Sequence, residues 1–159
     1  MASMNALVAD GAWLVYGLAH SLVPVWTVAI ASIAASTWTT WLLRRSVRGR
    51  DGLWAGAWMT TVATCWAGGA LPLALAATVL VTCGPQLVSA FASPSPIGLS
   101  AATWWIALVD AAAWGTYGVV LRDGALELYG VVLTTTALVL LLRLRAVAPR
   151  LQPRGPVEA

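Results

Sequence analysis

The sequence predicts an all-α, polytopic membrane protein with about six transmembrane helices. Hydrophobic residues make up 60% of its 159 residues and charged residues only 9%, whereas about a quarter of the residues in soluble domains are charged. All nine basic residues are arginines. Apolar stretches near the length that crosses a bilayer alternate with helix-breaking residues. The predicted spans are residues 4–20, 22–43, 53–69, 70–91, 99–120 and 125–146.

Each predicted span ends where the sequence disfavours a continued helix. Proline and glycine interrupt helices, and charged residues seldom enter the apolar core of a bilayer. The tail after residue 146 holds three prolines and no apolar periodicity, so residues 147–159 are expected to be disordered. The predicted breaks are His20-Ser21 with Pro24, the polar loop 44–52, Gly68-Gly69 with Pro72, Pro94-Ser95-Pro96 and Arg122-Asp123-Gly124.

The arginines predict the orientation of the chain. Four lie in residues 44–50 and four follow residue 142, and with six spans these two regions fall on one side of the membrane. Only Arg122 falls on the other side. Because basic residues concentrate in cytoplasmic loops, we expect a multi-pass protein of the cell (plasma) membrane with a cytoplasmic C-terminus.

Residues that carry most enzyme and metal chemistry are scarce. The chain has one histidine, six acids and two cysteines. Cys65 and Cys83 lie within apolar stretches, where cysteine is typical of a small core residue. No catalytic set and no zinc-ligand spacing can be assembled, and the arginines form no patch of nucleic-acid type. We therefore expect no enzyme, metal site, cofactor or nucleic-acid partner.

An internal repeat emerges when the sequence is compared with itself at an offset of 101 residues. Residues 6–44 then align with 107–145 without gaps, and nine of the 39 aligned positions are identical. The identities include a W-x-x-Y-G pattern that ends at Gly17 in the first copy and at Gly118 in the second. Both copies should cross the membrane in the same direction. We therefore expect parallel repeats related by an axis along the membrane normal, as in some transporters.

Three short motifs follow one another in the second half of the chain. Gly84-Pro85-Gln86 lies near the cytoplasmic end of the fourth predicted span, Gly98-Leu99-Ser100 leads into the fifth, and W-x-x-Y-G occupies residues 114–118. Together they resemble the PQ-loop superfamily, and specifically the SWEET and SemiSWEET sugar transporters. The resemblance covers residues 80–146 with all three motifs and residues 4–44 with the last one alone.

The resemblance implies a domain organisation. Full SWEET proteins have two three-helix repeats joined by a linker helix, and this chain resembles the last six of those seven helices. Residues 1–44 would form an incomplete first repeat of two helices, 45–69 a cytoplasmic loop and the linker helix, and 70–146 a complete repeat. The missing first helix would lie upstream in a longer gene, or a partner would supply it. A homo-oligomer is an open alternative.

The fifth predicted span carries the candidate solute site. An ionised carboxylate at the midpoint of a span is costly, so Asp110 should face a cavity or a partner. Helix geometry places Trp114 and Tyr117 on the same face. An indole can stack on the apolar side of a sugar, and a carboxylate accepts hydrogen bonds from hydroxyl or ammonium groups. In the other repeat, Asp10 and Trp13 offer a second carboxylate and a second indole.

The resemblance adds further residues to the site. The proline of the family's Pro-Gln pair is viewed as a hinge, which implies a hinge at Pro85, with Gln86 bonded to the freed backbone or to a neighbouring helix. SWEET sugar pockets usually carry an asparagine where Ala29 and Gly130 stand here, and neither can bond through its side chain. The alternatives are a structural aspartate at Asp110, packing or interfacial tryptophans, and a simple kink in the fourth span.

The sequence favours a membrane transporter of a small polar solute, and the resemblance implies a mono- or disaccharide. Alternating access between two helical bundles is the implied mechanism. The first alternative is a PQ-loop transporter of an amino acid or amine, coupled to protons through Asp110. The second alternative is a membrane receptor or assembly factor that transports no solute.

Overall fold

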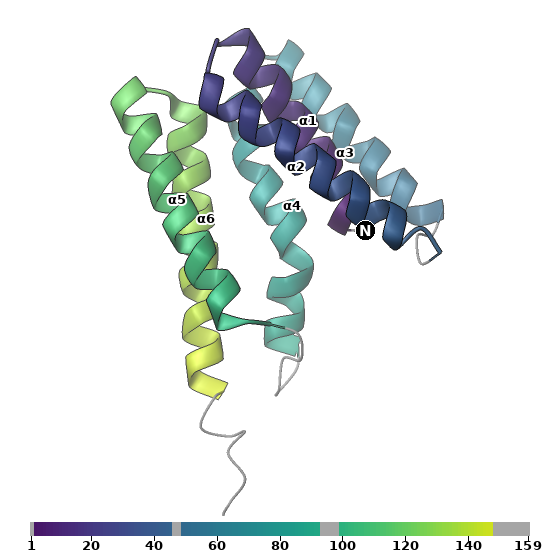
Figure 1. Ribbon diagram of the computed structural model, residues 1–159, viewed down its shortest axis with the longest axis vertical. Helices are drawn as coiled ribbons and strands as arrows, with labels where there is room; N and C mark the ends of the chain where they lie inside the picture. The colour runs from purple at the N-terminus through teal and green to yellow at the C-terminus, as the bar shows by residue number, and fades with distance from the viewer. Residues whose placement is uncertain (1, 46–48, 93–98, 148–159) are drawn as a thin grey trace, which may run out of the picture.

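The computed structural model describes residues 2–45, 49–92 and 99–147, which form six α-helices joined by short connections (Figure 1). The helices are α1 (Ala2–Ala19), α2 (Val23–Leu42), α3 (Gly49–Ala67), α4 (Leu71–Ala92), α5 (Ala101–Leu121) and α6 (Gly124–Val147). The predicted all-α class is confirmed. Both the first and the last residue of every helix lie within two residues of the predicted bounds, except for the first residue of α3.

The start of α3 corrects the sequence analysis. The helix begins at Gly49 and not at residue 53, so the second half of the predicted loop 44–52 is helical. Asp51 lies in the first turn, where a carboxylate interacts favourably with the positive end of the helix dipole, and its side chain is buried. Gly98, which begins the second motif, the predicted break at residues 94–96 and residues 148–159 of the predicted disordered tail lie outside the described residues. Val147, the first residue of that predicted tail, is the last residue of α6.

The helices form two groups that meet at α4 (Figure 1). In one group, α1 packs against α2 and α3. In the other, α6 lies between α5 and α4. Helix α4 also contacts α1 and α3, so it joins the two groups. Helices α1 and α5 run in one direction and α2 and α6 run back, so the α1–α2 and α5–α6 hairpins point the same way.

Three tight turns lie at one end of the molecule, named here the turn end, and connect α1 to α2, α3 to α4 and α5 to α6 (Figure 1). The opposite end, the loop end, holds the C-terminal ends of α2, α4 and α6. The described arginines outside α3 follow this division. Arg44, Arg45, Arg143 and Arg145 lie at the loop end, and Arg122 lies at the turn end.

The three turns share one backbone geometry. In each, a residue with positive φ follows the helix, and the amide of the next residue donates to the carbonyl five residues earlier, as in the Schellman motif. The positive-φ residues are Ser21 (56°), Gly69 (74°) and Arg122 (55°). The bonds run from Leu22 to Gly17 (2.8 Å), from Ala70 to Cys65 (2.7 Å) and from Asp123 to Gly118 (2.9 Å).

The turns after α1 and α5 also correspond at the offset of 101 residues. Two residues at this offset are called an offset pair below. Gly17 and Gly118 form an offset pair, and each lies where its helix meets the next one. An added Cβ would come within 2.8 Å of the Trp26 nitrogen at Gly17, and within 2.6 Å of the Glu127 nitrogen at Gly118. Close contact between helices therefore requires the glycine of each W-x-x-Y-G pattern.

Three of the described helices, α4, α5 and α6, are long and apolar enough to cross a membrane. Helices α1, α2 and α3 do not meet the same criteria of length and mean hydropathy. Large apolar side chains are nevertheless exposed on every helix, for example Trp38 on α2 (62% exposed) and Leu53 on α3 (76%). Soluble monomers seldom expose large apolar patches. The structure therefore supports a membrane protein, with α4–α6 as its candidate spans.

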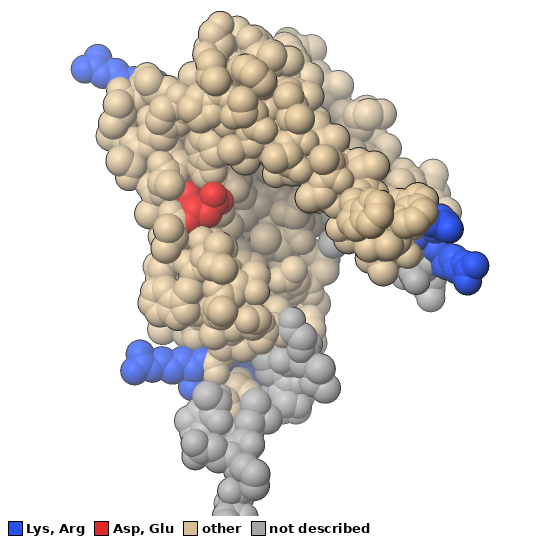
Figure 2. Space-filling model, viewed as in Figure 1, with Lys and Arg blue, Asp and Glu red and all other residues tan. Residues whose placement is uncertain are grey.

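Charged side chains are sparse on the flank drawn in Figure 2. Arginines, in blue, project near the ends of the molecule. Acidic atoms, in red, lie between these ends, beside a hollow in the surface. This view places the acidic group where an apolar environment would make an isolated carboxylate costly.

Candidate functional site

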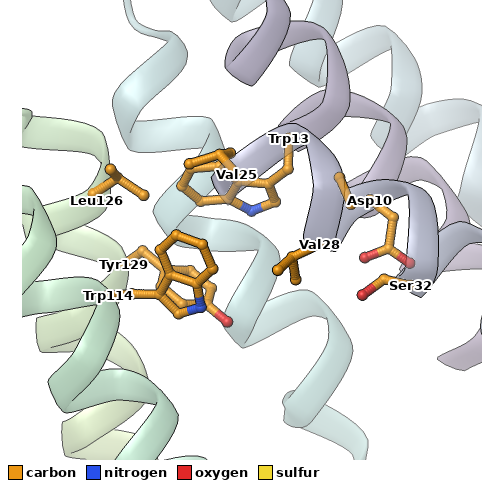
Figure 3. Close-up of a pocket in the computed structure, with 9 residues that line it drawn as sticks. Asp10, Trp13, Val25, Val28, Ser32, Trp114, Leu126 and Tyr129 are labelled. Carbon is orange, nitrogen blue, oxygen red and sulfur yellow. The ribbon is translucent and has the colours of Figure 1, made fainter. Parts of the chain in front are cut away.

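A pocket of about 90 Å³ lies between the α1–α2 hairpin and the α5–α6 hairpin (Figure 3). All four helices contribute to its wall. The lining residues are Asp10 and Trp13 of α1; Val25, Val28, Ala29 and Ser32 of α2; Trp114 of α5; and Leu126 and Tyr129 of α6. The pocket is thus built from the two segments that align with one another in the sequence.

Most of this lining consists of offset pairs. The pairs are Trp13 with Trp114, Val25 with Leu126, and Val28 with Tyr129. Such a lining is expected of two parallel repeats that face each other across a shared cavity. Asp10, Ala29 and Ser32 line the pocket without their offset partners, so the α1–α2 side is chemically distinct.

Three aromatic rings gather at the pocket, those of Trp13, Trp114 and Tyr129 (Figure 3). The Trp13 and Tyr129 rings meet edge to face, with their centroids 5.2 Å apart, which is a favourable arrangement. The Trp114 ring meets Tyr117 in the same way at 6.0 Å. Tyr117, a predicted site residue, does not line the pocket.

Two carboxylates lie near these rings. Asp10 lines the pocket and accepts a hydrogen bond of 3.0 Å from the Ser36 hydroxyl, and Figure 3 shows it beside Ser32, away from Trp114. Asp110 does not line the pocket. It is exposed on α5, 3.5 Å from the Tyr129 hydroxyl, at the outer limit of a hydrogen bond. Asp110 also forms a side-chain hydrogen bond with Trp114. Trp114 and Tyr129 therefore both connect the pocket to Asp110.

A larger cavity of about 320 Å³ continues from the pocket toward the loop end. It shares Asp10, Trp13, Ser32 and Tyr129 with the pocket. The remaining lining residues are Ala6 and Ala9 of α1; Ala35 and Ser36 of α2; Thr78, Val79, Thr82 and Cys83 of α4; and Leu133 of α6. Because the added positions on α1, α2 and α6 lie nearer the loop end, the two cavities form a path in that direction.

At the turn end the two hairpins are held together. The Tyr16 hydroxyl lies 2.9 and 2.7 Å from the two carboxylate oxygens of Asp123, a contact named here the Tyr16–Asp123 latch. Asp123 also accepts hydrogen bonds from the amides of Ala125 and Leu126, so one carboxylate caps α6 and binds α1. Tyr16 is buried with Leu75 and Ala125. Apolar packing and the latch together hold the two hairpins in contact at this end.

The structure brings together three of the predicted site residues: Asp10, Trp13 and Trp114 all line the pocket. Gly130 lies instead where α5 crosses α6, and an added Cβ there would come within 2.6 Å of the Gly115 Cα. Close helix contact therefore accounts for this glycine. Ala29, its offset partner, lines the pocket.

The predicted hinge residues lie on α4, toward the loop end. The helix continues through Pro85, which leaves the carbonyl four residues earlier without its helical hydrogen bond. The Gln86 side chain is exposed, and within the part of the chain that the structure describes it forms no hydrogen bond. The bond predicted for Gln86, to the freed backbone or to a neighbouring helix, is thus absent from these residues.

Sequence analysis did not identify Tyr129 or Ser32. Tyr129 lines both cavities, contacts Trp13 and approaches Asp110. Its offset partner is the apolar Val28, so the internal repeat gave no sign of a polar or aromatic site residue at this position. Ser32 follows Val28 by one helical turn and therefore shares its face.

These features define a helical membrane protein with a polar and aromatic pocket between two parallel hairpins. In comparisons with known proteins, the chain matches no family model, no curated protein and no solved structure. The resemblance to SWEET-like transporters therefore rests on the sequence motifs alone.

Proposed function

We propose that this protein is a membrane transporter that moves a small polar solute by alternating access between its two helix groups. The pocket lined by three offset pairs carries the proposal. Transporters built from repeats place their solute site at the interface between the repeats. The two hairpins here meet at such an interface, and each presents a tryptophan to it.

In this proposal all six helices cross the membrane, and the loop end faces the cytoplasm. The arginine distribution supports the orientation, and the exposed apolar side chains on α1, α2 and α3 support the additional spans. The path toward the loop end then opens to the cytoplasm, while the Tyr16–Asp123 latch closes the outer side. The described arrangement would be the inward-open state.

Release of the latch and closure of the loop end would produce the outward-open state. Helix α4 is suited to take part, because it contacts both helix groups and carries Pro85 within its length. A missing helical hydrogen bond lowers the resistance of a helix to bending at that point. This supports a hinge in α4, without a part for Gln86 in its hydrogen bonding.

Two solute classes are candidates. The resemblance favours a mono- or disaccharide, and the tryptophan rings at the pocket support stacking on a sugar. The second candidate is an amino acid or amine, with proton coupling through Asp110. The Asp10 carboxylate in the lining favours this candidate. Asp110 would then act on the solute through Tyr129, since it lies outside the lining.

Uptake into proteoliposomes tests the proposal. The purified chain should accumulate a radiolabelled sugar or amine, and replacing both Trp13 and Trp114 by alanine should abolish uptake. Trp105→Ala is the matched control, because Trp105 is exposed on α5 outside the pocket. Normal uptake by the double variant would contradict the proposed site. A well-folded chain that takes up neither class would favour a receptor or assembly factor.

A further inference from the structure

The described charged side chains at the pocket are acidic. Asp10 lies in the lining and Asp110 lies behind Tyr129. Among the described residues that line either cavity, none is an arginine or a histidine. A carboxylate in a low-dielectric site is costly unless an opposite charge or several hydrogen-bond donors compensate it. The only side-chain hydrogen bond described for Asp10 comes from Ser36.

The aromatic rings at the pocket also favour a cation. Ring faces carry negative electrostatic potential, and tryptophan binds a cation most strongly. Trp13, Trp114 and Tyr129 all contribute to the wall, and the edge-to-face contact between Trp13 and Tyr129 fixes two of these rings at an angle to one another. Aromatic rings set at an angle to one another can surround a rounded cation, as in the aromatic cages that bind quaternary ammonium groups.

The described lining offers less to a zwitterion or a sugar than to a cation. Arginine would be the natural partner for the carboxylate of an amino acid, and the described lining contains none. Among the described lining residues there is no asparagine or glutamine, so a sugar would have only the hydroxyls of serine, threonine and tyrosine as combined donors and acceptors. Ala29 occupies the position where the resemblance predicts such an amide.

Building on the proposed solute site, we infer that this pocket binds an organic ammonium cation that lacks a carboxylate group. Trp13, Trp114 and Tyr129 surround the cationic head, and Asp10 supplies the counter-charge. A neutral sugar leaves the Asp10 charge uncompensated. A zwitterion brings a second carboxylate to a site that already has one. The site therefore selects its ligand by charge.

Isothermal titration calorimetry on the full chain, in an uncharged and sugar-free detergent, tests this inference. Four probes separate the charge types: choline, its uncharged isostere 3,3-dimethylbutan-1-ol, the zwitterion glycine betaine, and D-glucose. Choline should bind at least about tenfold more tightly than each of the others, since a desolvated cation–π contact alone is worth about that factor. Equal binding of choline and its isostere, or tighter binding of glucose, would overturn the inference.

Matched variants locate the site. Asp10→Asn and Trp13→Leu should each weaken choline binding about tenfold or more. Glu127→Gln and Trp105→Leu are the controls, because neither residue lines the pocket or the larger cavity. Equal losses in Asp10→Asn and Glu127→Gln would contradict the assignment. If Asp10→Asn fails to fold, the four-probe comparison on the unmodified chain still decides the question.

Binding and transport can fail separately in this design. Choline binding without choline uptake into proteoliposomes would contradict the transport proposal and support the cation site. Glucose uptake without choline binding would support transport and overturn the cation site.

Discussion

The hydroxyl group of Tyr16 lies within 2.9 Å of one carboxylate oxygen of Asp123 and within 2.7 Å of the other. This contact joins the last turn of α1 to the residue that immediately precedes α6, so it crosses from one hairpin to the other. Any motion that separates the hairpins at the turn end must break it. The Tyr16–Asp123 latch is therefore a direct target for tests of alternating access.

Removing the latch should destabilise the described state. Tyr16→Phe keeps the ring that packs in the core cluster but loses the hydroxyl, and a hydrogen bond to a charged group contributes about 1.5–3 kcal/mol. We expect a lower midpoint of thermal unfolding in detergent. We also expect faster labelling of a cysteine placed at Val25 by a reagent added from the turn end, in a background free of native cysteines.

Tyr117→Phe is the control for that experiment. Tyr117 is the offset partner of Tyr16, and its hydroxyl forms no hydrogen bond with any residue that the structure describes. Its loss should leave both the unfolding midpoint and the labelling rate unchanged. Equal effects of the two substitutions would show that ring chemistry, and not the latch, is responsible.

Close helix contact at the two W-x-x-Y-G glycines predicts intolerance to a methyl group. Gly118→Ala would bring the new Cβ to 2.6 Å from the Glu127 nitrogen, and such overpacking costs about 1–3 kcal/mol. Gly11→Ala should be neutral or mildly stabilising, because nothing lies within 4 Å of its added Cβ and alanine favours a helix. Thermal unfolding of the two variants, side by side, measures the difference.

Positive φ angles at non-glycine residues predict a gain from glycine. Arg122 has a φ of 55°, a conformation that costs an ordinary residue about 1–2 kcal/mol. Arg122→Gly should therefore raise the unfolding midpoint, while Gly69→Ala, at a φ of 74°, should lower it. Unchanged stability in both variants would mean that these turns relax without cost.

Asp110 lies outside the pocket lining, so proton coupling and solute binding can be tested separately. Asp110→Asn should remove the pH dependence of uptake if this carboxylate carries protons. It should weaken solute binding less than Asp10→Asn does, because Asp10 lines the pocket and Asp110 does not. Uptake measured over a pH series, with binding measured in parallel, distinguishes the two effects. A variant that kept its full pH dependence would exclude proton coupling through Asp110.

Single cysteines at the two ends test the orientation. In cysteine-free chains expressed in intact cells, a membrane-impermeant thiol reagent should label Arg122→Cys and not Arg145→Cys. The reason is that Arg122 lies at the turn end and Arg145 at the loop end. The opposite result would place the C-terminus outside.

The helices could be predicted well because their boundaries depend on local chemistry. Turn residues and charges mark nearly every break between apolar stretches. The start of α3 was misplaced because Asp51 looks like a loop residue by charge, yet it suits the first turn of a helix and is buried by tertiary packing.

The candidate site was predictable only in part, because it depends on how each helix is rotated about its axis. The repeated tryptophans were found by pattern, and both line the pocket. On α5, the small residues Ala111, Gly115 and Gly118 lie against α6, which turns the neighbouring Asp110 to an exposed face. The same crossing brings Tyr129 to the pocket. No local signal in the sequence specifies that rotation.

The Tyr16–Asp123 latch is asymmetric, and this has a consequence for how the turn end of the proposed transporter would open. The offset partners of Tyr16 and Asp123 are Tyr117 and Leu22, so the reciprocal contact would pair a phenol with a leucine. A symmetric dimer of identical halves would form such a bond twice and would have to break both together. A single chain can hold the donor in one half and the acceptor in the other. In the proposed transporter, one substitution in either half would then be enough to change how often the turn end opens.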